Sequence, residues 1–205
     1  MKFILFVEGH TEKMALPSFL KRWLDPRLEQ RIGLNVVRFD GWPELIKDSP
    51  KKAKMYLNED NVIAVFALLD LYGPTIYPDD KQSASDRYEW AKKHLEKKVD
   101  DRRFHQYFAV HETEAWLLSN PDLFPTVIKN ALPSRVQNPE EVDFDQPPSK
   151  LLGKLYREKT KHTYKKVAHG KELLDKLDPE VAYQKCLRLK HLLDDMLKMA
   201  KEAGL

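Results

Sequence analysis

The amino-acid sequence predicts an α/β fold in which helices flank a mostly parallel β-sheet. Three observations support this class. Uninterrupted apolar, β-prone runs recur, as expected for strands buried on both faces. Segments with the helical spacing of apolar residues alternate with these runs, which favours parallel strands joined by helices. From residue 149 onward the strand signal disappears and only helical patterns remain.

The first part of the chain supplies the strands. Strand patterns cover residues 3–7, 34–39, 61–69 and 104–110. Helical patterns cover residues 11–23, 43–57, 84–99 and 112–119. Pro17 is a weak point in the first helix, because proline is tolerated only in the first turns. We therefore predict an α/β core over residues 1–119.

The second part is helical, with patterns over residues 151–155, 171–177 and 181–200. Proline-rich stretches at residues 120–121 and 145–148 bracket a weakly patterned segment. We predict that residues 120–205 form a helical cap packed on the core, within one compact domain.

Composition bounds the possible roles. The 205 residues include 35 basic and 32 acidic side chains, and a net charge of +3 does not by itself demand a nucleic-acid partner. The single cysteine, Cys186, excludes an internal disulfide, and no spacing indicates a zinc site. The apolar run at the N-terminus is too short for a signal peptide or a membrane span. We expect a cytoplasmic protein without a membrane partner; the oligomeric state is not predicted.

Acidic residues follow three of the predicted strands. Glu8 follows the first strand, Asp70 the third, and Glu112 with Glu114 the fourth. Ligands of open α/β sheets collect at the carboxyl ends of the strands. Mg²⁺ prefers carboxylate oxygens together with substrate phosphates. Each acid alone also suits a helix cap or a solvated turn, so the metal interpretation depends on their joint occurrence.

A basic stretch runs from residue 150 to residue 171, where Glu158 is the only acid. The predicted nucleic-acid contacts are Lys150, Lys154, Arg157, Lys161, Lys165, Lys166 and Lys171. Tyrosine and histidine side chains lie between them and can stack on unpaired bases. The alternative is a solvated charged surface. Lys150 and Lys171 are also candidates to face a substrate phosphate.

Two motifs resemble those of Toprim domains. Phe6-Val7-Glu8-Gly9 resembles the first, in which a strand delivers Glu-Gly before a helix. Leu69-Asp70-Leu71-Tyr72 resembles the second, normally Asp-x-Asp after a strand. Tyr72 replaces the second acid, which removes one metal-facing carboxylate. Topoisomerases, bacterial primases and overcoming-lysogenization-defect (OLD) nucleases share this fold.

Over nearly its whole length, the chain more closely resembles a bacterial Toprim-like family, domain of unknown function 4276. The similar segments are residues 7–12, 70–73, 112–117, 147–150, 165–171 and 186–189. The resemblance implies a Toprim-like sheet, bound Mg²⁺ or Mn²⁺, and a place in bacterial defence beside OLD-type nucleases.

Two functional hypotheses follow. In the first, the chain is a metal-dependent nuclease for DNA or RNA; Glu8, Asp70 and Glu112 hold the metal, and Glu114 and Lys150 complete the catalytic set. A separately encoded ABC/OLD-like ATPase would be its partner, since the sequence has no Walker motif. In the second, the chain is a non-catalytic module that binds nucleic acid or protein. Nucleotide handling remains a third option.

Overall fold

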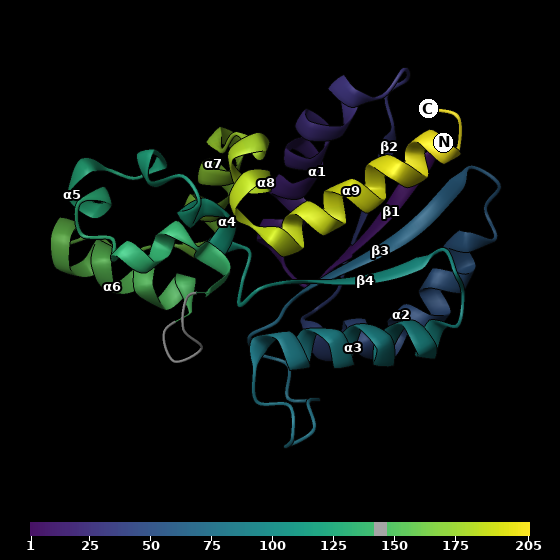
Figure 1. The fold of residues 1–205 in the computed structure, drawn as a ribbon, viewed down its shortest axis with the longest axis horizontal. Helices are drawn as coiled ribbons and strands as arrows, with labels where there is room; N and C mark the ends of the chain where they lie inside the picture. The colour runs from purple at the N-terminus through teal and green to yellow at the C-terminus, as the bar shows by residue number, and fades with distance from the viewer. Residues whose placement is uncertain (142–146) are drawn as a thin grey trace.

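The computed structural model describes residues 1–141 and 147–205. Its core is a four-stranded sheet in the order β2-β1-β3-β4, with every neighbouring pair parallel (Figure 1). The strands are β1 (Lys2–Val7), β2 (Gly33–Arg38), β3 (Val62–Asp70) and β4 (Phe104–Ala109). The predicted fold class, a parallel sheet flanked by helices, is confirmed.

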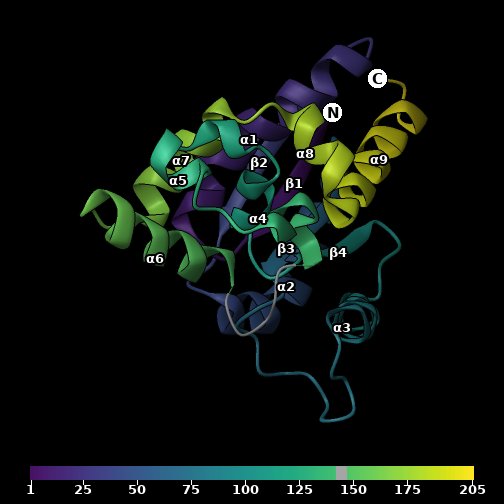
Figure 2. The same cartoon turned by 60° about the vertical axis from the view of Figure 1, so that its left-hand side comes forward.

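Helices cover both faces of the sheet. The connecting helices are α1 (His10–Leu24), α2 (Trp42–Leu57) and α3 (Ala84–Val99), and α9 (Leu187–Glu202) comes from the end of the sequence. Helices α2 and α3 pack on one face, and α1 and α9 pack on the other, as the two views in Figure 1 and Figure 2 show. The sheet is therefore the middle layer of three.

The alternating side chains of β1 explain why both faces are apolar. Phe3, Leu5 and Val7 belong to the core on the α1 side, whereas Ile4 and Phe6 belong to the core on the α2 side. All five are fully buried. Successive side chains of a strand point to opposite faces, so an unbroken apolar run places β1 in the interior of the sheet.

Helix α1 continues through Pro17, which lies beyond its first two turns. Sequence reasoning expected a weak point there. The neighbouring Leu16, Phe19 and Leu20 are almost completely buried against the sheet. Tertiary packing of this apolar face outweighs the local cost of the missing N–H.

The C-terminal extension begins at residue 120 and ends with α9. The remaining helices lie between β4 and α9. They are α4 (Glu114–Leu118), α5 (Thr126–Lys129), α6 (Pro148–Thr160), α7 (Lys166–Lys176) and α8 (Pro179–Lys185). Helices α4 to α7 lie beyond the carboxyl ends of the strands (Figure 1). One apolar core includes residues from both predicted parts of the chain. The boundary between residues 119 and 120 stays a prediction, and residues 145 and 146 of the second proline-rich stretch lie outside the described residues.

One expected helix is two helices in the structure. The pattern over residues 181–200 predicted a continuous helix, but the backbone is extended at Cys186, with φ −114° and ψ 97°. Cys186 is fully buried, and the Lys185 ammonium donates to the carbonyl of Ser119 at 2.7 Å. These tertiary contacts are invisible to local periodicity. Within the described part of the chain, no helix is long and apolar enough to cross a membrane.

The stacking of Phe19 on Trp116 joins α1 to α4, with ring centroids 5.8 Å apart. Trp116 is 1% exposed. We predict that Trp116→Ala lowers the free energy of unfolding by about 3–5 kcal/mol, because it leaves a large cavity. Denaturant unfolding measures this change. Met14→Ala on the exposed side of α1 is the control, and an equal loss in both variants would contradict the assignment.

Candidate functional site

The carboxyl ends of β1, β3 and β4 bring together the acids that the sequence singled out. Glu8 follows β1, and Asp70 is the last residue of β3. Strands β1 and β3 are paired, and Asp70 pairs with Ala109 of β4. The chain then turns at His111, whose φ of 63° is unusual for a residue with a side chain. This turn precedes Glu112 and Glu114.

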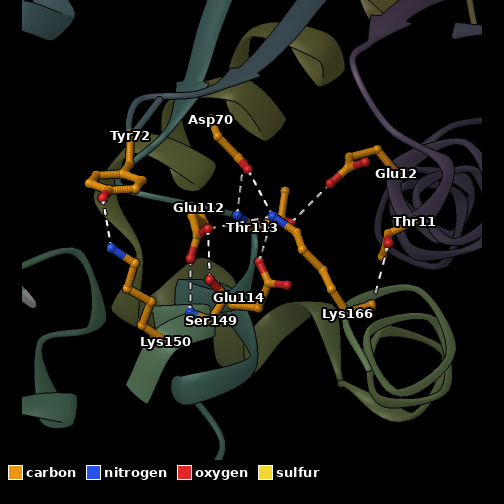
Figure 3. Close-up of polar contacts among 10 residues, drawn as sticks. All are labelled: Thr11, Glu12, Asp70, Tyr72, Glu112, Thr113, Glu114, Ser149, Lys150 and Lys166. Atoms are coloured by element: carbon orange, nitrogen blue, oxygen red, sulfur yellow. Dashed lines mark hydrogen bonds and ion pairs between the residues drawn. The ribbon is translucent and has the colours of Figure 1, made fainter. Parts of the chain in front are cut away.

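A lysine ammonium lies among these acids. Nζ of Lys166 is 3.1 Å from Oδ2 of Asp70, 3.4 Å from Oε2 of Glu114 and 3.6 Å from Oε1 of Glu112 (Figure 3). Lys166 is the first residue of α7. Sequence reasoning placed it among the nucleic-acid contacts, whereas in the structure its ammonium points into the acid cluster.

The structure adds a fifth acid, Glu12, which sequence reasoning did not assign to the site. Glu12 lies in the first turn of α1 and is 5% exposed. Its Oε1 accepts a hydrogen bond from Oγ1 of Thr113 at 3.3 Å. We use the term acid cluster for Glu8, Glu12, Asp70, Glu112 and Glu114. The signal for Glu12 was its place in the Glu-Gly motif, but an acid in a first helical turn also has an ordinary structural reason.

Gly9 leaves room for this fifth acid. A Cβ atom at Gly9 would collide with Oε2 of Glu12. A side chain at position 9 would therefore push Glu12 out of its present place. This close approach gives a physical reason for the glycine that follows Glu8.

Thr113 connects two members of the acid cluster. Its backbone N–H donates to Oδ1 of Asp70 at 3.1 Å, and its hydroxyl donates to Glu12. Thr113 is 2% exposed. One buried residue thus orients carboxylates that come from β3 and α1.

Glu112 has a different environment from Glu114. Its Oε2 accepts from the backbone N–H of Ser149 at 2.8 Å, and its Oε1 accepts from Oγ of Ser149 at 2.8 Å. Glu112 therefore ties the start of α6 to the end of the sheet, where a carboxylate also complements the helix dipole. Glu114 is 1% exposed, and neither of its oxygens has a hydrogen-bond partner among the described residues.

Burial and mutual repulsion disfavour the charged forms of Glu8, Asp70 and Glu114. Burial and the nearby charge of Asp70 raise the pKa of Glu8 to about 8. Burial raises the pKa of Asp70 to about 7 and that of Glu114 to about 8, although Lys166 works in the opposite direction on both. Burial works to lower the pKa of Lys166, but Asp70, Glu114 and Glu112 outweigh it and raise that pKa above its ordinary value. One ammonium does not compensate the cluster.

The donor set suits Mg²⁺ or Mn²⁺ in its chemistry and charge. All five members offer carboxylate oxygens, and those of Glu114 and Oε2 of Glu8 are buried without hydrogen bonds among the described residues. In their present positions, however, no three acidic, histidine or cysteine side chains of the described residues form a group that could hold a metal ion. The chemistry of the donors thus suits the ion, but ligation requires the carboxylate side chains to move from their present positions.

Lys150 and Tyr72 form a pair beside the acid cluster. Nζ of Lys150 donates to the Tyr72 hydroxyl at 3.0 Å and lies 5.3 Å from the ring centroid (Figure 3). Ser149, the residue before Lys150, is held in place by the hydrogen bond from its backbone N–H to Glu112. The Tyr72 side chain, which replaces an acid of the Toprim motif, therefore faces a cation.

The predicted nucleic-acid contacts lie on α6, on α7 and between these helices. The exposed ones are Lys150, Lys154, Arg157, Lys161 and Lys165. Lys171 is half-buried and pairs with Asp175 on α7 at 2.6 Å. Five of the predicted contacts are therefore exposed on this part of the extension, and we call these five residues the basic face. Lys166 and Lys171 are paired with acids.

The fold and the site define an α/β protein with a carboxylate cluster at the carboxyl edge of a parallel sheet. The chain belongs to the family described as Domain of unknown function (DUF4276), which matches residues 7–197. This match confirms the family resemblance seen in the sequence. No curated protein matches the chain significantly.

Solved structures that resemble the chain include C-terminal regions of OLD proteins. The region from Burkholderia pseudomallei has a TM-score of 0.49 at 16% identity, covering 96% of this chain and 98% of that chain. One from Xanthomonas campestris pv. campestris has a TM-score of 0.43 at 16% identity, covering 98% of both chains. Scores below 0.5 at this identity do not support a functional assignment.

The raised pKa values predict how stability depends on pH without divalent ions. The folded protein retains protons that the unfolded chain loses, so its free energy of unfolding should fall as pH rises from about 5 through about 8. Each extra retained proton adds a slope of about 1.4 kcal/mol per pH unit. Denaturant unfolding in EDTA measures the slope.

Glu114→Gln is the control for this prediction, because it removes one titrating group while keeping the shape of the side chain. It should flatten the slope between about pH 6 and pH 8. A wild-type protein whose stability rises across this range would show that the acids are charged and compensated in the fold.

Proposed function

We propose that the chain is a metal-dependent phosphodiester hydrolase that acts on DNA or RNA. The observation that carries this proposal is the convergence of carboxylates from three strand ends and α1, with the buried Glu114 lacking hydrogen bonds among the described residues. Structural acids at strand ends are normally capped, solvated or matched by a cation each, whereas here a single ammonium serves Asp70, Glu112 and Glu114. An excess of buried carboxylates favours a site built for a cation.

In the proposed site, Glu8, Asp70 and Glu114 hold Mg²⁺ or Mn²⁺. Sequence reasoning gave Glu112 as a third ligand. Both of its oxygens accept hydrogen bonds from Ser149, so Glu112 would have to bind the ion while keeping these bonds. Such an ion supplies charge neutralisation at a phosphate oxygen and an activated water. Thr113 donates to both Asp70 and Glu12 and so fixes these two carboxylates relative to each other.

Lys150 and Tyr72 supply the phosphate contact in this proposal. The Lys150 ammonium is exposed, and the Tyr72 hydroxyl offers a second polar group 3.0 Å from it. Both lie next to Glu112 at the edge of the acid cluster (Figure 3). A phosphodiester held there would lie between the carboxylates and the exposed lysines of α6.

A partner ATPase completes the proposal. The sequence lacks a Walker motif, so any ATP hydrolysis comes from another chain. The family resemblance to OLD-type nucleases supports an ABC/OLD-like ATPase as that chain. The same resemblance supports a role in bacterial defence. The single cysteine favours a reducing cytoplasm as the compartment.

A non-catalytic nucleic-acid-binding module is the second candidate. Two observations favour it: Lys166 contacts three of the carboxylates, and Tyr72 replaces an acid of the Toprim motif. Such a module would use the exposed basic residues of the extension without cutting. Cutting and binding are therefore tested separately.

The nuclease assay incubates the protein with plasmid, single-stranded DNA and RNA in Mg²⁺, Mn²⁺ or EDTA. We expect cutting that requires the divalent ion and falls more than about a hundredfold in Glu8→Gln and Asp70→Asn. Asp60→Asn, an exposed acid at the opposite end of the sheet, is the matched control and should keep full activity. Cutting that persists in both site variants would refute the assignment.

Binding is tested on the basic face with Lys154→Ala combined with Arg157→Ala. If these residues contact phosphates, affinity for single-stranded DNA falls, and the slope of log K against log salt decreases by roughly 1.4. Lys97→Ala combined with Lys98→Ala on α3 is the charge-matched control. Fluorescence anisotropy at several salt concentrations measures both. Equal losses in the two double variants would mean that only net charge matters.

A further inference from the structure

Close packing between α7 and α1 determines where Lys166 lies. The backbone carbonyl of Lys166 accepts from Oγ1 of Thr11 at 3.5 Å. One turn later, a Cβ at Gly170 would come within 3.0 Å of Cγ2 of Thr11. A larger residue at position 170 would force α7 away from α1. The glycine thus lets α7 approach closely enough to deliver the Lys166 side chain to the acid cluster.

The contacts of Lys166 resemble those of a bound cation. Its ammonium is within 3.6 Å of three carboxylates from two different segments of the chain. These acids are Asp70 at the end of β3 and Glu112 and Glu114 after β4. Oxygen atoms arranged around one positive charge are the environment that a hard metal ion also requires.

A single ammonium leaves the cluster undercompensated. Glu114 is 1% exposed and has no hydrogen bond among the described residues, and the buried Oε2 of Glu8 likewise has none. The Lys166 side chain is 38% exposed, so part of it already faces solvent. A divalent ion would bring twice the charge to the same oxygens. Two cations about 4 Å apart repel each other strongly in a partly buried site.

We propose that Lys166 is a tethered cation that fills the acid cluster in the metal-free protein and swings out when a divalent ion binds. This inference rests on the proposed metal site and adds its regulation. The flexible lysine stem allows the exchange without unfolding α7. The released ammonium joins the exposed Lys165 at the start of the same helix, so metal loading adds positive charge to the basic face.

Metal binding to the full chain tests the exchange. Titration calorimetry with Mn²⁺ alone compares wild type with Lys166→Met, Lys166→Arg and the neighbouring control Lys165→Met. Loss of the competing charge should tighten Mn²⁺ binding about tenfold or more in Lys166→Met. Lys166→Arg, which keeps the charge, and Lys165→Met should not show this gain. Unchanged or weaker binding in Lys166→Met would overturn the proposal.

A second measurement needs no variant and therefore does not depend on whether Lys166→Met folds. Wild-type protein is labelled with an amine-acylating reagent with and without Mg²⁺, and mass spectrometry quantifies each lysine. Labelling of Lys166 should rise severalfold when Mg²⁺ is present, whereas that of Lys165 should not change. Equal labelling of Lys166 in both conditions would overturn the exchange.

The two proposals fail in different ways. If neither wild type nor Lys166→Met binds Mn²⁺, the metal site itself is wrong, and both proposals fall. If both bind Mn²⁺ equally, the metal site stands and the exchange by Lys166 is refuted. Tighter binding in Lys166→Met without any nuclease activity would support the exchange and leave the catalytic proposal unsupported.

Discussion

The crowding of carboxylates at one edge of the sheet is the constraint on which the rest of this structure depends. Parallel strands end on the same side, so acids that follow β1, β3 and β4 are forced together. Burying charged carboxylates costs free energy. Hydrogen bonds from Thr113 and Ser149 and the ammonium of Lys166 offset part of this cost. These contacts draw α1, α6 and α7 toward the same point.

The C-terminal extension is attached to the sheet by polar contacts as well as by its apolar core. Glu112 holds the start of α6, and Asp70 holds the start of α7 through Lys166. At the C-terminal end of α7, Arg22 of α1 donates to the carbonyls of Leu174 and Leu177. The helices that carry the basic residues are thus positioned directly by members of the acid cluster, which couples the geometry of the two features.

Several residues of the site could be predicted from the sequence because their places follow from the order of parallel strands. Glu8, Asp70, Glu112 and Glu114 stand at predictable places relative to apolar strands, and parallel order brings such places together. Glu12 was missed because an acid in a first helical turn has an ordinary local explanation. Lys166 was grouped with its basic neighbours because nothing in a run of lysines marks the one that turns inward.

The sequence by itself determined the layered α/β architecture, the strand ends and the helical character of the extension, because these depend on local periodicity and on the burial of apolar runs. Only the tertiary structure decided which acid is tied to a helix start and which lacks a hydrogen bond among the described residues. It also decided that a lysine about a hundred residues from Asp70 in the sequence completes the cluster. Such pairings depend on how α7 packs against α1, and contacts between distant segments leave no periodic trace in the sequence.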